Sequence, residues 1–109
     1  MKLRYIRTEE YNSLTHLHKK SIYQCGNYTI NDLTVSGENG YHRIGVINYK
    51  EYLPEIYPVY DRDEVVTGFS ISVNSREFVD MEKYKEFISA QHEALEVVKI
   101  LTEKFVKKS

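Results

Sequence analysis

The sequence of 109 residues predicts an α+β fold in which an antiparallel sheet of about four strands packs against a long C-terminal helix. Two observations support this prediction. Apolar residues recur at three- and four-residue spacing over residues 81–105, which is the period of an amphipathic helix. Residues 65–73 alternate between apolar and mostly small or polar side chains, as in a strand with one buried face. A short N-terminal helix completes the predicted fold.

Residues 8–20 are predicted to form that short helix, after a short strand at residues 2–7. Thr8 can accept a hydrogen bond from an unpaired backbone N–H, and the two glutamates that follow it favour the positive end of a helix dipole. Two lysines close the segment, where a C-terminal turn prefers cations. Apolar side chains recur at every third position, at Tyr11, Leu14 and Leu17.

Residues 21–49 are rich in β-branched and aromatic side chains and are predicted to form a meander of three strands. Gly26-Asn27 separates the first two strands and predicts a tight hairpin. The segment from Gly37 to Gly40 separates the second strand from the third and contains glycines that tolerate positive φ. This segment lies between strands and lacks the Lys-Ser/Thr of a phosphate-binding loop, so hairpin geometry explains it.

Residues 50–64 fit neither period and are predicted to form a long ordered loop or an edge segment, because Pro54 and Pro58 each lack a backbone N–H. The clearest strand follows at residues 65–73. The face that it directs toward the core is predicted to carry Val65, Thr67, Phe69, Ile71 and Val73.

The helix at residues 81–105 is predicted to begin after Asp80, whose carboxylate can cap it. Its length of about 37 Å, at 1.5 Å per residue, exceeds that of a nine-residue strand, so its C-terminal turns are expected to extend beyond the sheet. Val97 and Ile100 are predicted to lie toward the charged side of this helix. Either the N-terminal helix or another chain would then cover Ile100, or it would remain exposed.

Length and composition place the chain among ordinary globular proteins, and we expect residues 1–109 to form a single domain. The net charge of −1 disfavours a protein whose main function is to bind the phosphates of nucleic acid. A single cysteine cannot form an internal disulfide, and no segment has the continuous apolar stretch of a signal peptide or a membrane span. We therefore expect a cytoplasmic protein with no membrane partner.

The residues that could bind a metal or act as a nucleophile do not form a recognised motif. His16-x-His18 would converge on one ion only if this segment were extended, and no Cys-x-x-Cys accompanies it. Cys25 lies in a predicted strand, where a buried, inert thiol is the usual state. Solvated or capping roles are expected for the histidines, which include His42 and His92. We therefore predict no metal, no cofactor and no enzymatic activity.

The segment from residue 49 to residue 64 is the predicted partner-binding site. It combines four tyrosines with five acidic and two basic residues, a local charge of −3, and its two prolines limit its flexibility. Such a surface could dock on a basic groove through charge complementarity and aromatic anchors, or it could be a solvated connection. The predicted site consists of Tyr49, Glu51, Tyr52, Glu55, Tyr57, Tyr60, Asp61, Asp63 and Glu64.

These features favour a non-enzymatic protein-binding module. In composition, rich in Lys, Glu, Asn, Ile and Tyr, the sequence resembles small orphan proteins of phages and mobile elements in low-GC bacteria, which include anti-CRISPR inhibitors. This resemblance, which involves no specific motif, implies an inhibitor of a host protein that handles nucleic acid. One alternative is a homodimer formed through the C-terminal helix. A minor alternative is single-stranded nucleic-acid binding by the first twenty residues, whose charge is +3 and which contain Tyr5 and Tyr11.

Overall fold

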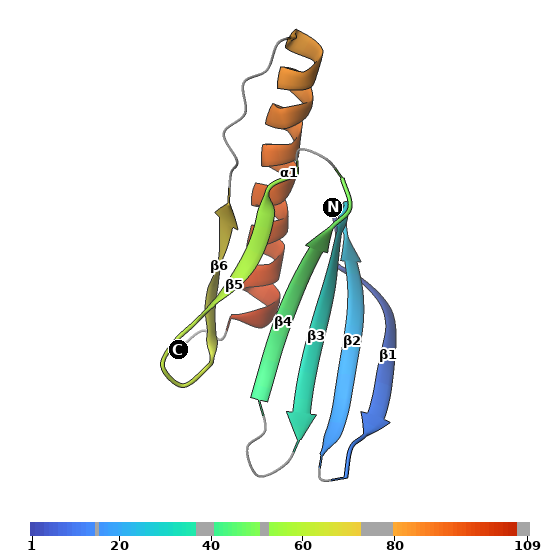
Figure 1. The fold of residues 1–109 in the computed structure, drawn as a ribbon. Helices are drawn as coiled ribbons and strands as arrows, with labels where there is room; N and C mark the ends of the chain where they lie inside the picture. Colours follow the sequence, from blue (N-terminus) through green and yellow to red (C-terminus); the bar gives the residue numbers. More distant parts are fainter. Residues whose placement is uncertain (15, 37–40, 51–52, 73–79, 107–109) are drawn as a thin grey trace.

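The computed structural model describes residues 1–14, 16–36, 41–50, 53–72 and 80–106. Within them the predicted α+β fold is confirmed: four strands form one antiparallel sheet in the order β1-β2-β3-β4, two form a separate hairpin, and a long helix follows (Figure 1). The elements are β1 (Arg4–Asn12), β2 (Leu17–Cys25), β3 (Tyr28–Ser36), β4 (Tyr41–Asn48), β5 (Glu55–Tyr60), β6 (Val66–Ser72) and α1 (Met81–Phe105).

The β2–β3 hairpin forms as the sequence predicts. Cys25 pairs with Tyr28 across the two-residue turn Gly26-Asn27, and Gly26 has a φ of 59°, a conformation that favours glycine. Strand β3 then pairs antiparallel with β4. The predicted turn from Gly37 to Gly40 lies outside the described residues. The meander has one strand more than residues 21–49 alone predict, because β1 adds to its edge.

The short helix predicted at residues 8–20 is wrong. These residues form most of β1, a turn and the start of β2, and the apolar residues that suggested a helical face, Tyr11, Leu14 and Leu17, are all exposed. The four charges that suggested helix ends instead pair across the strands, with Glu10 bonded to Lys19 and Glu9 to Lys20. Opposite charges on adjacent strands stabilise a sheet in the way that such pairs stabilise a helix.

Within the segment predicted as a long ordered loop or an edge segment, residues 55–60 form strand β5, which pairs with β6. Pro58 is tolerated in β5 because each strand of a two-stranded sheet has a side that needs no ladder hydrogen bonds. The strand predicted at residues 65–73 is confirmed in β6, but Val66 is buried and Val65 is exposed. The pairing shifts register between Val59 and Tyr60, so one extra β6 residue, Thr67, reverses the alternation at this end.

The core lies where one face of the β1–β4 sheet, the inner face of the β5–β6 hairpin and helix α1 meet. Phe105 lies between the two sheets, with its ring centroid 6.1 Å from that of Tyr23 on β2 and 6.5 Å from that of Phe69 on β6. The buried members of the core are Cys25, Tyr28, Ile30, Ile44, Leu53, Ile56, Val66, Ala94, Val97 and Leu101.

Helix α1 begins as predicted, because the Asp80 carboxylate accepts a hydrogen bond of 2.8 Å from the backbone N–H of Lys83. All of the fully buried α1 residues lie in its second half, and it is the first turns that project beyond the sheets (Figure 1). The predicted overhang is therefore at the wrong end. Val97 is completely buried and Ile100 packs against the core, so neither lies on an exposed outer side; Leu95, at 61% exposure, does.

Two buried titratable groups in the core predict that the protein loses stability at alkaline pH. Burial raises the pKa of the Cys25 thiol above its ordinary value of 9.0, and burial together with Glu93 raises the pKa of the Tyr28 hydroxyl above 10.0. The unfolded chain releases these protons at lower pH than the folded chain. The stabilisation is therefore fully present below about pH 9 and declines as the pH rises beyond that value.

We expect the urea midpoint of unfolding to fall between about pH 8 and pH 10.5, with Cys25→Ala reducing the earlier part of the loss. The comparison uses the pH slope of each protein, because the alanine also removes core volume. Equal slopes for the wild type and Cys25→Ala between about pH 8 and pH 9.5 would contradict the assignment to Cys25.

Candidate functional site

The structure describes seven of the nine predicted partner-binding residues, and it places them after β4, along β5 and in the turn that follows β5. Glu51 and Tyr52 lie outside the described residues. Tyr49, which follows β4, is 78% exposed, and Glu55 begins β5, at the end of the hairpin that is remote from the turn between β5 and β6. At about 3.3 Å per residue, β5 separates Glu55 from Tyr60 by about 17 Å. The described members of the predicted site are therefore spread along the hairpin.

Tyr60 points inward and has a structural role. Its hydroxyl oxygen accepts a hydrogen bond of 3.0 Å from the backbone N–H of Ile44, on the edge of β4 that faces away from β3. The guanidinium carbon of Arg43 lies 5.0 Å from the centroid of the Tyr60 ring, a cation–π distance. Tyr60 thus holds the hairpin against the β4 edge, and its role as a partner anchor stays a prediction.

The acidic turn after β5 is held by Asp61. Its Oδ1 atom accepts hydrogen bonds from the backbone N–H groups of Asp63, at 2.8 Å, and Val65, at 3.0 Å. Glu64 adopts a φ of 61°, and its carboxylate forms an ion pair with Arg43 at 2.8 Å. Asp61 and Glu64 therefore stabilise this turn, whereas Asp63 directs an exposed charge outward.

The outer face of the β5–β6 hairpin is the surface on which the remaining predicted residues gather. Glu55, Tyr57 and Val59 alternate outward along β5, while Ile56 and Tyr60 face the core. Exposure is 48% for Tyr57, 39% for Val59 and 44% for Val65. Gly68 is the β6 partner of Val59, and a Cβ atom added there would meet nothing within 4 Å. We define this outer face by Glu55, Tyr57, Val59, Val65 and Gly68.

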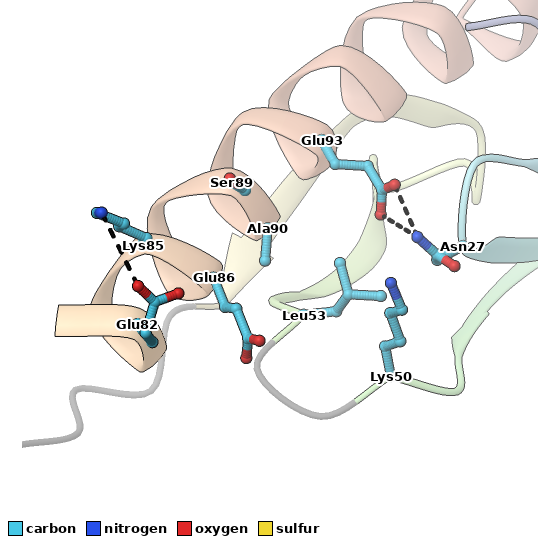
Figure 2. Close-up of a pocket in the computed structure, with 9 residues that line it drawn as sticks. All are labelled: Asn27, Lys50, Leu53, Glu82, Lys85, Glu86, Ser89, Ala90 and Glu93. Carbon is cyan, nitrogen blue, oxygen red and sulfur yellow. Dashed lines mark hydrogen bonds and ion pairs between the residues drawn. The ribbon is translucent and has the colours of Figure 1, made fainter. Parts of the chain in front are cut away.

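A groove of about 510 Å³ lies elsewhere, between the first half of α1 and the residues around Leu53 (Figure 2). Leu53 and Ala90 provide its apolar lining. In Figure 2 the Glu86 carboxylate and the Lys50 ammonium lie on opposite sides of Leu53. The remaining lining residues are Asn27, Glu82, Lys85, Ser89 and Glu93.

Two of the three acidic side chains around this groove contact other lining residues. The Asn27 amide donates to both carboxylate oxygens of Glu93, at 2.9 and 3.2 Å, and joins the β2–β3 turn to α1. Lys85 lies 4.0 Å from Glu82 on the next turn of the helix. The described lining residues include neither histidine nor cysteine, so they offer no nucleophile with a neighbouring imidazole base. We assign this groove no chemistry.

The histidines and the cysteine are placed apart. His18 lies in strand β2, its ring centroid is 6.5 Å from that of His16, and the Tyr11 ring stacks on His18 at 4.4 Å. His42 contacts Asp32 on the adjacent strand. Within the described residues, no three His, Cys, Asp or Glu side chains converge as a metal site would require. Cys25 is completely buried.

The architecture defines a small α+β protein whose meander sheet, separate hairpin and C-terminal helix share one core. No protein family, curated protein or solved structure that we compared with the chain matches it. Among the described residues, no helix has the length and apolar character needed to cross a membrane.

Sequence reasoning missed two features of the exposed surface. It treated the segment around Pro58 as irregular, so the alternation that directs Tyr57 outward and Tyr60 inward was not used. It also assigned Lys19 and Lys20 to the end of a helix, whereas in the structure Lys20 lies in β2 and pairs with Leu33 of β3. Alternation at Glu55, Tyr57 and Val59 was the available signal for the hairpin, since an apolar residue stands between each pair.

Proposed function

We propose that the chain is a non-enzymatic protein-binding module that docks through the outer face of the β5–β6 hairpin and the adjacent acidic turn. The observation that supports this proposal is the exposed apolar strip of Tyr57, Val59 and Val65 beside that turn. Apolar and aromatic side chains at the centre of an interface, with charges at its rim, are the usual arrangement for protein recognition.

The complementary partner surface is a basic groove. Asp61, Asp63 and Glu64 stand together at one end of the hairpin, and Glu55 stands at the other. Acidic groups at both ends would meet cations on either side of an apolar contact, which favours correct orientation and fast association. Proteins that handle nucleic acid present such grooves, and a chain that occupies the groove would exclude the nucleic acid. This is the inhibitor function that we propose.

The test reverses charges that have no role in the fold. Asp61 is left unchanged because its two backbone hydrogen bonds hold the turn. We expect the double variant Glu55→Lys with Asp63→Lys to weaken partner binding at least about tenfold, while its melting temperature stays close to that of the wild type. The partner is captured from the native host, identified by mass spectrometry, purified and titrated by calorimetry.

The matched control is Glu96→Lys with Glu103→Lys, which changes the net charge equally but lies on exposed positions of α1. Tyr57→Ala tests the apolar part of the same interface. The proposal is supported if the hairpin variants lose affinity and the helix variant retains it. Equal affinity for all of them would show that the partner binds elsewhere.

A further inference from the structure

The face of the β1–β4 sheet that points away from the core combines basic and aromatic side chains in ordered rows. Partners in adjacent antiparallel strands share a face, so the register defines this open face. Its residues, from β1 to β4, are Arg4, Gln24, Thr29 and Ile47; then Arg7, Ile22, Asn31 and Gly45; then Glu9, Lys20, Leu33 and Arg43; then Tyr11, His18 and Val35. The buried core cluster contains none of them.

Charge on the open face is positive although the whole chain carries −1. Among the described residues of this face, the cations are Arg4, Arg7, Lys20 and Arg43, and Glu9 is the one acidic residue. The Glu9 carboxylate lies 3.0 Å from Arg7 and 3.5 Å from Lys20, so both of its oxygens are already engaged. Arg43 is paired with Glu64. Even with that pair neutralised, positive charges on the open face outnumber negative ones.

An aromatic platform stands at one end of the same face. The Tyr11 ring stacks nearly parallel on His18, with an angle of 6° between the rings, and Tyr11 remains 54% exposed. Stacking on His18 fixes the orientation of the tyrosine ring. An ordered and accessible ring of this kind can stack on an unpaired base. A base within a duplex is already stacked between its neighbours and does not expose its face to the ring.

Gly45 on β4 and its partner Asn31 on β3 leave room in the middle of the face. A Cβ atom at Gly45 would have Asn31 Cβ as its nearest neighbour, at 4.0 Å, so the backbone is accessible from this side. In the row next to it, the Thr29 hydroxyl donates a hydrogen bond of 2.8 Å to Gln24 Oε1, and the Gln24 amide donates one of 2.9 Å to the Gly26 carbonyl. The Asn31 amide beside Gly45 adds a polar group to the middle of the face. Ile22 and Val35 on this face are nonetheless buried, at 8% and 7% exposure.

We propose that the open face of the β1–β4 sheet binds a single-stranded nucleic acid, with Arg4, Arg7 and Lys20 on its phosphates and Tyr11 stacked on a base. An acidic protein would satisfy the cations but would leave Tyr11 without a base. A duplex would need more cations than this face holds, because phosphate contacts dominate its affinity. The inference uses a different surface from the proposed protein-docking hairpin and does not depend on it.

The test measures fluorescence anisotropy of a labelled ten-nucleotide single strand, as RNA and as DNA, with a duplex of the same sequence and a polyglutamate peptide as comparisons. For the single strands we expect a Kd between about 10⁻⁶ and 10⁻⁴ M in 50 mM salt. Two or three phosphate contacts predict roughly 7- to 20-fold weaker binding in 200 mM salt. Absence of single-strand binding at 100 µM protein in 50 mM salt, or tighter binding of the duplex or the peptide, overturns the proposal.

Two glycine substitutions form a matched pair. Gly45→Glu places a carboxylate in the middle of the open face, and Gly68→Glu places the same charge on the hairpin, in both cases with space for the new Cβ atom. We expect Gly45→Glu to weaken single-strand binding at least about tenfold and Gly68→Glu to leave it within about twofold. Equal losses from the two variants would mean that net charge alone controls binding, which overturns the proposal.

Tyrosine variants test the stacking contact and remain informative if Gly45→Glu fails to fold. We expect Tyr11→Ala to weaken binding roughly fivefold or more and Tyr11→Phe to retain it, since phenylalanine keeps the ring. Tyr57→Ala, at a tyrosine of similar exposure on the hairpin, is the control and should bind as the wild type does. If Tyr11→Ala also binds as the wild type does, Tyr11 stacks on no base and the proposal fails.

Discussion

Replacing Leu101 by alanine is expected to lower the free energy of unfolding by about 2–5 kcal/mol, the largest change that we predict for a single side chain. Leu101 is completely buried, in the half of α1 that contacts the sheets. Its removal leaves a cavity that rigid strands on one side and the helix on the other cannot close. The melting temperature should fall by roughly 10–25 °C, as measured by circular dichroism.

Leu95 provides the matched control, because it is also a leucine of α1 but is 61% exposed. Leu95→Ala removes the same atoms from a position largely in contact with water, so the change should stay within about 0.5 kcal/mol. Similar losses for the two variants would mean that α1 is rotated about its axis relative to the sheets, or that another chain covers Leu95.

The contrast between Leu95 and Val97 shows that the sequence pattern predicts the helix but not which of its apolar residues are buried. Periodicity correctly predicted a helix over residues 81–105 and its cap at Asp80, because both depend on local spacing. It placed Val97 toward the charged side of the helix, whereas in the structure Val97 is completely buried and Leu95 is 61% exposed. Apolar residues occupy more than half of the circumference of α1. Several rotations of the helix about its axis would therefore direct apolar side chains toward the sheet. Only tertiary contacts determine that choice.

The N-terminal error has the same origin in local ambiguity. Glu9, Glu10, Lys19 and Lys20 have the arrangement of a capped helix when they are considered alone. In the structure they pair across β1 and β2 at contacts of 3.4 and 3.5 Å. A helix at residues 8–20 would have needed a surface on which to bury its apolar face, whereas addition of β1 to the sheet gives its backbone ladder hydrogen bonds.

The candidate sites were predictable to different degrees. Residues of the hairpin were identified from composition, yet the alternation of β5 separates Tyr57 from Tyr60, and the turn uses Asp61 as a structural acceptor. The open face of the β1–β4 sheet was not predicted as a unit. Its basic residues are brought together by the register of four strands, of which β4 contributes Arg43 from outside the N-terminal basic segment.

Tyr28→Phe is expected to lower the free energy of unfolding by about 1–3 kcal/mol, the cost of leaving a buried carbonyl without a partner. Tyr28 is completely buried in β3, and its hydroxyl donates a hydrogen bond of 2.6 Å to the carbonyl of Pro54, immediately before β5. The phenylalanine ring fills nearly the same volume, so packing should be preserved. Urea unfolding of the two proteins at pH 7 provides the measurement.

The control is Tyr57→Phe, whose ring is about half exposed on the outer face of the hairpin and whose loss of a hydroxyl should change stability by less than about 0.5 kcal/mol. Tyr28→Phe should also remove the part of the alkaline loss that begins near pH 10, because it eliminates the hydroxyl whose pKa burial raises. A Tyr28→Phe protein as stable as the wild type would mean that the Pro54 carbonyl finds another donor. The β5–β6 hairpin would then be joined to the β1–β4 sheet by apolar packing and by the Tyr60 contact to β4, without the Tyr28 hydrogen bond.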